Sequence, residues 1–107
     1  METKTDLTVA KTIIQQLGHK CLYMIGAKKP YSVWADGVNF RIGRNLGRWS
    51  SISITLNGTD LYDVTFYRLR KHKITAEKTH TDIYFDGLHE LIETETGMAT
   101  SLGTMGG

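Results

Sequence analysis

The chain has 107 residues, of which 40% are hydrophobic and 22% charged, and its formal net charge is +2. These values are typical of one folded domain with a single core, and they exclude an intrinsically disordered chain. No stretch approaches the roughly 18 apolar residues of a membrane span, and the opening METKTDL lacks the features of a signal peptide. We therefore expect one intracellular domain over residues 1–107, with frayed ends at residues 1–5 and 102–107.

The N-terminal region predicts a helix followed by a strand. In DLTVAKTIIQQLG, apolar residues recur at helical spacing, with Asp6 as the N-cap and Gly18 as the stop. The next segment, KCLYMIGA, is apolar on both alternating faces and predicts a central strand that is covered on both sides. Residues 26–30, which include the only proline, mark a break after this strand.

The middle of the chain predicts antiparallel strands joined by tight turns. Asp36 and Gly37, between SVWA and VNFRI, predict a two-residue hairpin turn, because both residues tolerate the positive φ of a primed turn. SISITL and LYDVTFYRLR alternate apolar and polar residues on either side of NGTD, so they predict an antiparallel pair. HKITAEK predicts a weaker strand, followed by a turn near His80 and a short strand in DIYF.

The C-terminal region predicts a second helix in DGLHELIETETG. Asp86 is placed to cap it, an apolar stripe runs from Leu88 to Ile92, and Gly97 ends it. The order of elements is helix, then five to six strands, then helix. This order predicts an α+β fold, a single domain in which an antiparallel β-meander packs both helices on its apolar face.

Residues of the types that carry catalysis or bind metals are present but scattered. Cys21 lies in an apolar segment, where a buried structural thiol is expected rather than a nucleophile. The four histidines lack the spacing of zinc ligands, and the glycines of RIGRNLGRWS do not form a nucleotide-binding motif. Asp60 and Asp63 suit an acid–base pair or a calcium site with Asn57, but a turn needs these residue types in any case. The sequence therefore predicts no enzyme, no metal and no cofactor.

Basic residues concentrate in the middle of the chain. Residues 41–73 hold seven Lys or Arg against two Asp, a net +5, and residues 74–107 hold one Lys against six acids, a net −5. If RIGRNLGRWS folds near the end of LYDVTFYRLR, one patch forms that suits phosphate or carboxylate groups and offers a tryptophan for contact. The predicted contact residues are Arg41, Arg44, Arg48, Trp49, Arg68, Arg70, Lys71 and Lys73. The alternative is a solvated loop whose tryptophan caps the core.

Five segments of the chain carry a family resemblance: AKTIIQQLG, MIGAKK, ISITLNGTDLYDVTFYRL, IYFDGLHE and TGMATSL. Together they resemble a family of small proteins carried by bacteriophages and other mobile elements, whose members read TILEQLGG…MTGAK…ITLN…D.Y…F…Y.D.L…TGL. The match runs from Val9 to Leu102, and it departs from the pattern at His19, where glycine is usual, and at Ile25, where threonine is usual. The resemblance implies a shared fold and a mobile-element origin, and it brings no catalytic residue with it.

The resemblance also implies a role in the cytoplasm of a bacterial host. Small proteins of this origin are commonly accessory factors of the anti-CRISPR or anti-defence kind, which bind and inhibit a host protein or ribonucleoprotein complex. Either the basic patch would compete for nucleic acid, or the acidic closing helix, with Glu90 and Glu93, would imitate phosphate. The alternative function is a small nucleic-acid-binding protein that uses the basic surface. An exposed sheet edge would also allow a homodimer.

Overall fold

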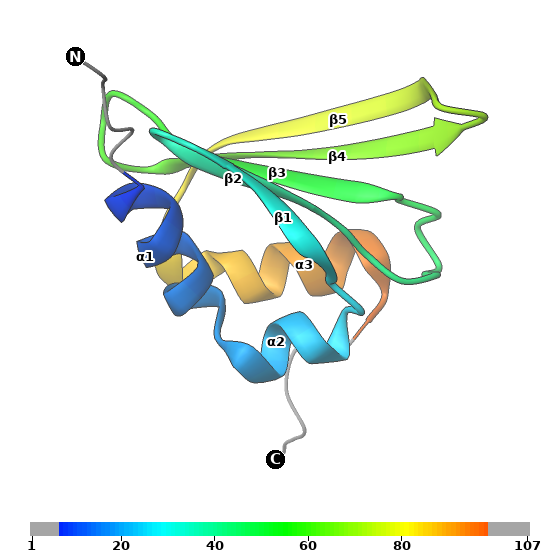
Figure 1. Ribbon diagram of the computed structural model, residues 1–107, viewed down its shortest axis with the longest axis horizontal. Helices are drawn as coiled ribbons and strands as arrows, with labels where there is room; N and C mark the ends of the chain where they lie inside the picture. Colours follow the sequence, from blue (N-terminus) through cyan, green and yellow to red (C-terminus); the bar gives the residue numbers. More distant parts are fainter. Residues whose placement is uncertain (1–6, 99–107) are drawn as a thin grey trace.

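The computed structural model describes residues 7–98, apart from the side chain of Pro30, and these residues form two layers (Figure 1). The elements in chain order are α1 (Thr8–Leu17), α2 (His19–Met24), β1 (Lys28–Trp34), β2 (Gly37–Arg41), β3 (Ser51–Leu56), β4 (Tyr62–Arg70), β5 (Lys73–Ile83), the 3-10 turn η1 (Phe85–Gly87) and α3 (Leu88–Thr96). The strands form one antiparallel sheet in the order β1-β2-β3-β4-β5, and the helices cover one of its faces. The α+β meander expected from the sequence is confirmed.

The core lies between the sheet and the helices. Alternate residues of β2, β3 and β4 face the helices, and the apolar stripes of α1 and α3 face the sheet, as their spacing predicts. The largest fully buried side chains include Ile13, Leu17, Phe40, Ile52, Ile54, Phe66, Leu88 and Ile92. Because burial of each large apolar side chain contributes about 1.5–3 kcal/mol, these contacts hold the two layers together. Within residues 7–98, no helix is long and apolar enough to cross a membrane.

The segment KCLYMIGA forms helix α2, so the prediction of a central strand there is wrong. A strand covered on both faces would bury Cys21, Leu22 and Tyr23 alike, whereas the structure buries Cys21 and Leu22 and leaves Tyr23 84% exposed. Gly18, with φ 87°, turns the chain between α1 and α2, so the second helix can pack beneath the same sheet. A short apolar run does not distinguish a helix from a strand by periodicity alone, which explains the error.

The β1–β2 hairpin also differs in detail from its prediction. Trp34 pairs with Gly37, so the turn occupies residues 35–36, and neither Asp36 nor Gly37 has a positive φ. Gly37 is required for close packing instead, because a Cβ there would lie 2.7 Å from the carbonyl oxygen of Ile54. Pro30 lies inside β1 rather than before it. β1 is an edge strand with an irregular register in this stretch, and such strands tolerate proline.

The region after β4 contains one long strand where two short ones were predicted. β5 continues through His80, and its register with β4 shifts between Tyr62 and Val64, so an irregularity takes the place of the predicted turn.

At the start of α3 the N-cap is Gly87, and no side chain caps the helix, so the prediction for Asp86 is wrong. Gly97 ends α3 in the left-handed conformation, as predicted. The predicted cap at Asp6 and the frayed ends lie outside the described residues.

Candidate anion-binding groove

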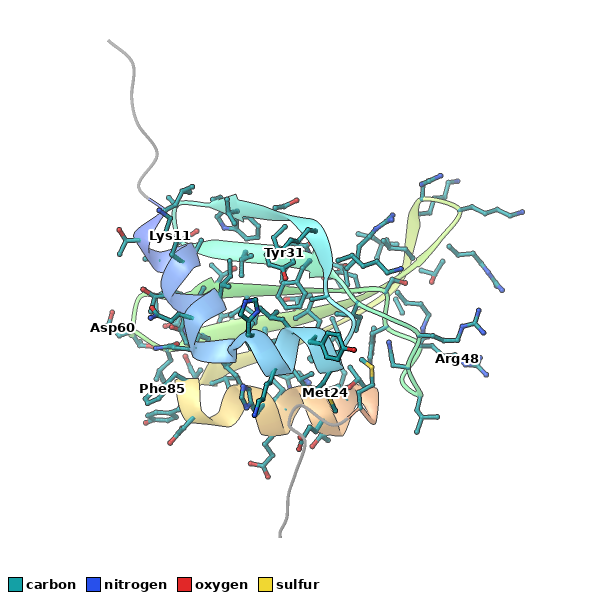
Figure 2. The ribbon with its side chains drawn as sticks, turned by 60° about the horizontal axis from the view of Figure 1, so that its bottom comes forward. Lys11, Met24, Tyr31, Arg48, Asp60 and Phe85 are labelled. Atoms are coloured by element: carbon teal, nitrogen blue, oxygen red, sulfur yellow. The ribbon has the colours of Figure 1, made fainter. Side chains whose placement is uncertain are left out.

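A groove of about 820 Å³ opens at one end of the sheet. It lies between residues 43–50, which we call the arginine loop, and the tip of the β4–β5 hairpin. Its lining residues are Lys28, Arg41, Ile42, Gly43, Arg44, Asn45, Arg48, Trp49, Ser50, Leu69, Lys71 and His72. Five of them are Lys or Arg and none is Asp or Glu, so we call it the basic groove. Figure 2 shows Arg48 at this end of the molecule and Asp60 and Phe85 at the other.

The meander brings these cations together from distant parts of the chain. In an antiparallel sheet of consecutive strands, β1 and β5 begin at the same end at which β2 and β4 finish. Lys28, the first residue of β1, therefore pairs with Arg41, the last residue of β2. Lys71 follows the end of β4 and closes the opposite side of the groove. The positive charge that is concentrated in residues 41–73 of the sequence is thus also concentrated at one place in the structure.

Asn45 fixes the shape of the arginine loop. Its Nδ2 donates to the carbonyl oxygens of Gly43, at 2.8 Å, and Trp49, at 2.7 Å, and its Oδ1 accepts from the Trp49 amide at 3.0 Å. The Leu46 amide donates to the carbonyl oxygen of Thr96, at 3.0 Å, and so ties the loop to the end of α3. One side chain closes the loop at three points, so the loop is pre-organised rather than a flexible connection.

Arg68 clamps the same loop from β4. Its Nη2 donates to the carbonyl oxygen of Gly47, at 3.0 Å, and its Nε donates to that of Arg48, at 3.3 Å. Its guanidinium carbon lies 5.0 Å from the centroid of the Trp49 ring, a cation–π arrangement. Trp49 also packs on Phe66 of the core, with ring centroids 5.8 Å apart. Arg68 therefore positions the loop, and Trp49 is held in the scaffold while part of it lines the groove.

The hairpin tip is conformationally strained. Lys71 and His72 form a two-residue turn with φ of 50° and 68°, in the left-handed region where Asn and Gly are the usual residues. Each such non-glycine residue costs on the order of 1 kcal/mol. Both side chains are exposed and both line the basic groove. The structure thus places a lysine and a histidine where the backbone favours Asn and Gly.

The predicted contact residues divide into three groups. Arg41, Arg44, Arg48, Trp49 and Lys71 line the groove together. Arg68 acts as the clamp described above, and Arg70 and Lys73 are exposed on the hairpin outside the groove lining.

Seven of the lining residues lie outside the predicted set, and three of these contribute to the charge or the shape of the groove: Lys28, Asn45 and His72. The β1–β2 hairpin alone places Lys28 across from the end of β2, so a register count from the turn would have found it. No pattern in the sequence indicates the three hydrogen bonds of Asn45.

The acidic helix α3 presents its carboxylates in two ways. Glu90 and Glu93 are exposed, whereas the Oε2 of Glu95 accepts from His80 Nε2 at 2.8 Å and from Lys78 Nζ at 3.0 Å. Burial acts to raise the pKa of Glu95, but the hydrogen bonds and charges of Lys78 and His80 outweigh it, so the pKa lies below its ordinary value. Glu95 thus ties the end of α3 to strand β5, next to the arginine loop.

The other candidate sites show no arrangement suited to catalysis. Burial, with a smaller effect of the Glu93 charge, raises the pKa of the Cys21 thiol to about 11, so the thiol stays protonated at neutral pH. Asp63 and Asp82 each accept from Asn57 Nδ2 at 2.9 Å, which ties the β3–β4 turn to the end of β5. Within residues 7–98, no three His, Cys, Asp or Glu side chains are grouped so that they could hold a metal ion.

Comparisons with protein-family models, with curated proteins and with solved structures find no match to this chain. The resemblance to phage-borne proteins therefore stays a prediction from the sequence, and the function has to be argued from the groove itself.

Proposed function

We propose that this protein is a non-enzymatic nucleic-acid-binding protein whose basic groove holds a phosphate backbone. The observation that carries the proposal is the meeting of five Lys and Arg side chains in one groove that no carboxylate of residues 7–98 lines. Guanidinium groups bind phosphate oxygens in a fork, and ammonium groups bind them as point charges. The pre-organised arginine loop presents Arg44 and Arg48 on an ordered backbone, so binding has to order only their side chains.

The arrangement of the cations favours a polymer over a single small anion. All five groove cations are exposed at the surface, and the basic surface continues onto Arg70 and Lys73 of the hairpin. The groove offers one tryptophan, held against Arg68 and Phe66, instead of a row of free aromatic rings for base stacking. Contacts to phosphate fix the position of a protein on nucleic acid without reading its bases. The binding is therefore tolerant of sequence.

The family resemblance supplies a setting for this chemistry. In a phage or mobile-element accessory protein, in the cytoplasm of a bacterial host, the groove competes with a defence complex of the CRISPR type for a guide or target strand. The acidic surface of α3 is the weaker contact candidate. Glu90 and Glu93 supply two exposed carboxylates, whereas a duplex carries one charge per roughly 1.7 Å of its axis.

The test is the salt dependence of binding to a labelled duplex and a labelled single strand, followed by fluorescence anisotropy. If the five groove cations each neutralise one phosphate, the plot of log K against log salt has a slope of about −4.5 for the duplex. Arg44→Ala and Lys71→Ala, one on each wall, each reduce the steepness by about 1. Lys11→Ala is the matched control, because Lys11 is exposed at the opposite end of the molecule (Figure 2).

Two results would contradict the proposal. One is an affinity that does not respond to salt. The other is a loss of affinity in Lys11→Ala that equals the loss in the groove variants. Arg68→Ala is not a clean test of phosphate contact, since its guanidinium holds the arginine loop through Gly47 and Arg48.

A further inference from the structure

The end of the sheet opposite the basic groove is acidic. Every aspartate of residues 7–98 lies there, in the turns, at the strand ends or in η1: Asp36, Asp60, Asp63, Asp82 and Asp86. The same meander that gathers the cations at one end gathers these carboxylates at the other, because turns alternate between the two ends of the sheet. Lys11, at the start of α1, is a cation on this side (Figure 2). One end of the sheet therefore carries mainly positive side chains, and the opposite end carries mainly negative ones.

An exposed aromatic pair lies within this acidic end. Tyr84 and Phe85 are 65% and 60% exposed, and the exposed Asp82 and Asp86 flank them in the chain. Adjacent large rings left in solvent are unusual, and aromatic residues are the commonest anchors of protein interfaces. We call Tyr84 and Phe85, with Asp82 and Asp86, the acidic aromatic end.

The basic groove has the complementary composition. Ile42, Trp49 and Leu69 supply apolar lining, and the cations of both walls surround it. An apolar centre with a charged rim is the usual anatomy of a protein interface, and opposite charges on the two rims steer the partners into register. The groove volume of about 820 Å³ is sufficient for two aromatic side chains.

We propose that the acidic aromatic end of one copy docks into the basic groove of a second copy. Because the two surfaces lie at opposite ends of the molecule, the contact is head-to-tail and leaves a free groove on one copy and a free acidic aromatic end on the other. Such a contact continues from copy to copy, as an open chain or a ring, instead of forming a symmetric dimer. It differs from sheet-edge pairing, because side chains make the contact and no backbone hydrogen bonds form between edge strands. It is independent of the proposed function, although a second copy and nucleic acid would compete for the groove.

Two variants, each blocked at one surface, test the contact in protein freed of nucleic acid. Arg44→Glu with Lys71→Glu blocks the groove, and Tyr84→Lys with Asp86→Lys blocks the acidic aromatic end. Alone, each variant should stay a monomer of 12.0 kDa in sedimentation velocity at low salt. Mixed, they retain one intact surface of each kind and should form a one-to-one complex of doubled mass. The unmodified protein should form longer chains as its concentration rises, and these should dissociate in about 0.5 M salt.

The outcomes separate this contact from the others. A mixture that stays monomeric, or an unmodified protein that stays monomeric at low salt, overturns the proposal. So does a closed dimer that persists in both blocked variants, which would indicate sheet-edge pairing. Matching unfolding midpoints show that the variants are folded. The variant blocked at the acidic aromatic end keeps an intact groove, so its nucleic-acid affinity tests the proposed function separately.

Discussion

The two walls of the basic groove are built in opposite ways. The arginine loop is held by the amide of Asn45, by the Arg68 clamp and by the end of α3. The hairpin tip projects past the helices (Figure 1) and carries two strained residues, Lys71 and His72, with exposed side chains. Arg48 of the arginine loop also has a positive φ, of 60°, but hydrogen bonds to its amide and carbonyl hold it there, whereas the hairpin tip is strained at the surface where no packing explains the strain. That contrast indicates a fixed wall that sets the position of a ligand and a projecting wall that supplies charge.

Gly47→Ala should have the largest effect, because it breaks the fixed wall. A Cβ at this position would overlap the carbonyl oxygen of Glu95 and would lie 2.7 Å from the Trp49 ring. The loop and the end of α3 would have to separate, which costs on the order of 3 kcal/mol of unfolding free energy. Urea unfolding measures the loss of stability. Affinity for nucleic acid should fall with it, because Arg44 and Arg48 would move away from the groove.

Gly58→Ala is the matched control for this experiment. Gly58 lies in the β3–β4 turn, without a positive φ, and a Cβ there would meet nothing within 4 Å. Its unfolding free energy should change by less than about 0.5 kcal/mol. If the two alanine variants were equally stable, the arginine loop would be free to move and the contrast between the walls would disappear.

The difference between the walls also explains which features could be predicted from the sequence. The alternation in SISITL and LYDVTFYRLR depends on local burial, and it predicts both strands and their pairing. Four of the five groove cations were selected by their charge, whereas Lys28 was missed because only the β1–β2 register places it there. The clamp role of Arg68 could not, because it depends on where Gly47 and Arg48 place their carbonyl oxygens.

Two features were missed in the sequence for the same physical reason, because the rest of the fold and not the local sequence sets their conformation. Helix α2 was predicted as a strand because its six residues contain too few turns to display a helical period, and packing beneath the sheet decides its conformation. Lys71 and His72 gave no turn signal, since neither residue belongs to the Asn-Gly type of sequence that favours a two-residue turn with positive φ. A sequence that departs from local preference in this way is expected at functional positions.

The second prediction concerns the projecting wall. Replacing Lys71 with Asn and His72 with Gly gives the turn its preferred residues, so the unfolding free energy should rise by about 1–2 kcal/mol. The same change removes a cation from the groove, so affinity for nucleic acid should fall and the salt dependence should become less steep by about 1. Urea unfolding and fluorescence anisotropy measure the two effects, which run in opposite directions.

Lys73→Asn controls for the loss of charge on the hairpin. Lys73 is exposed, has no positive φ and does not line the groove. It should leave stability unchanged and affect binding less than the double replacement. An Asn-Gly tip that fails to stabilise the protein would refute the assignment of strain. If the Asn-Gly tip stabilised the protein without weakening the binding of nucleic acid, the hairpin would not be part of the contact surface.

The smallest expected effect concerns Glu95, which ties α3 to β5 next to the fixed wall. The pKa of the Glu95 carboxyl is lower in the folded protein than its ordinary value of 4.5, so its charge stabilises the folded protein at pH values above 4.5. This contribution is lost as the pH falls through the pKa of the folded state. Glu95→Gln should lower the unfolding free energy by about 1 kcal/mol at neutral pH, since Lys78 is largely solvent-exposed. The difference from the unmodified protein should shrink below pH 4.5.

Urea unfolding across that pH range measures the difference, and Glu77→Gln serves as the control, because Glu77 is exposed on the same strand as Lys78. A deficit in Glu95→Gln that does not change with pH would mean that the carboxylate charge is unimportant and only its hydrogen-bonding oxygen matters. Since the hairpin tip has no such anchor, Glu95→Gln should leave the stability gained from the Asn-Gly replacement unchanged when the two are combined. Additivity of the two effects would show that the walls of the groove are stabilised independently.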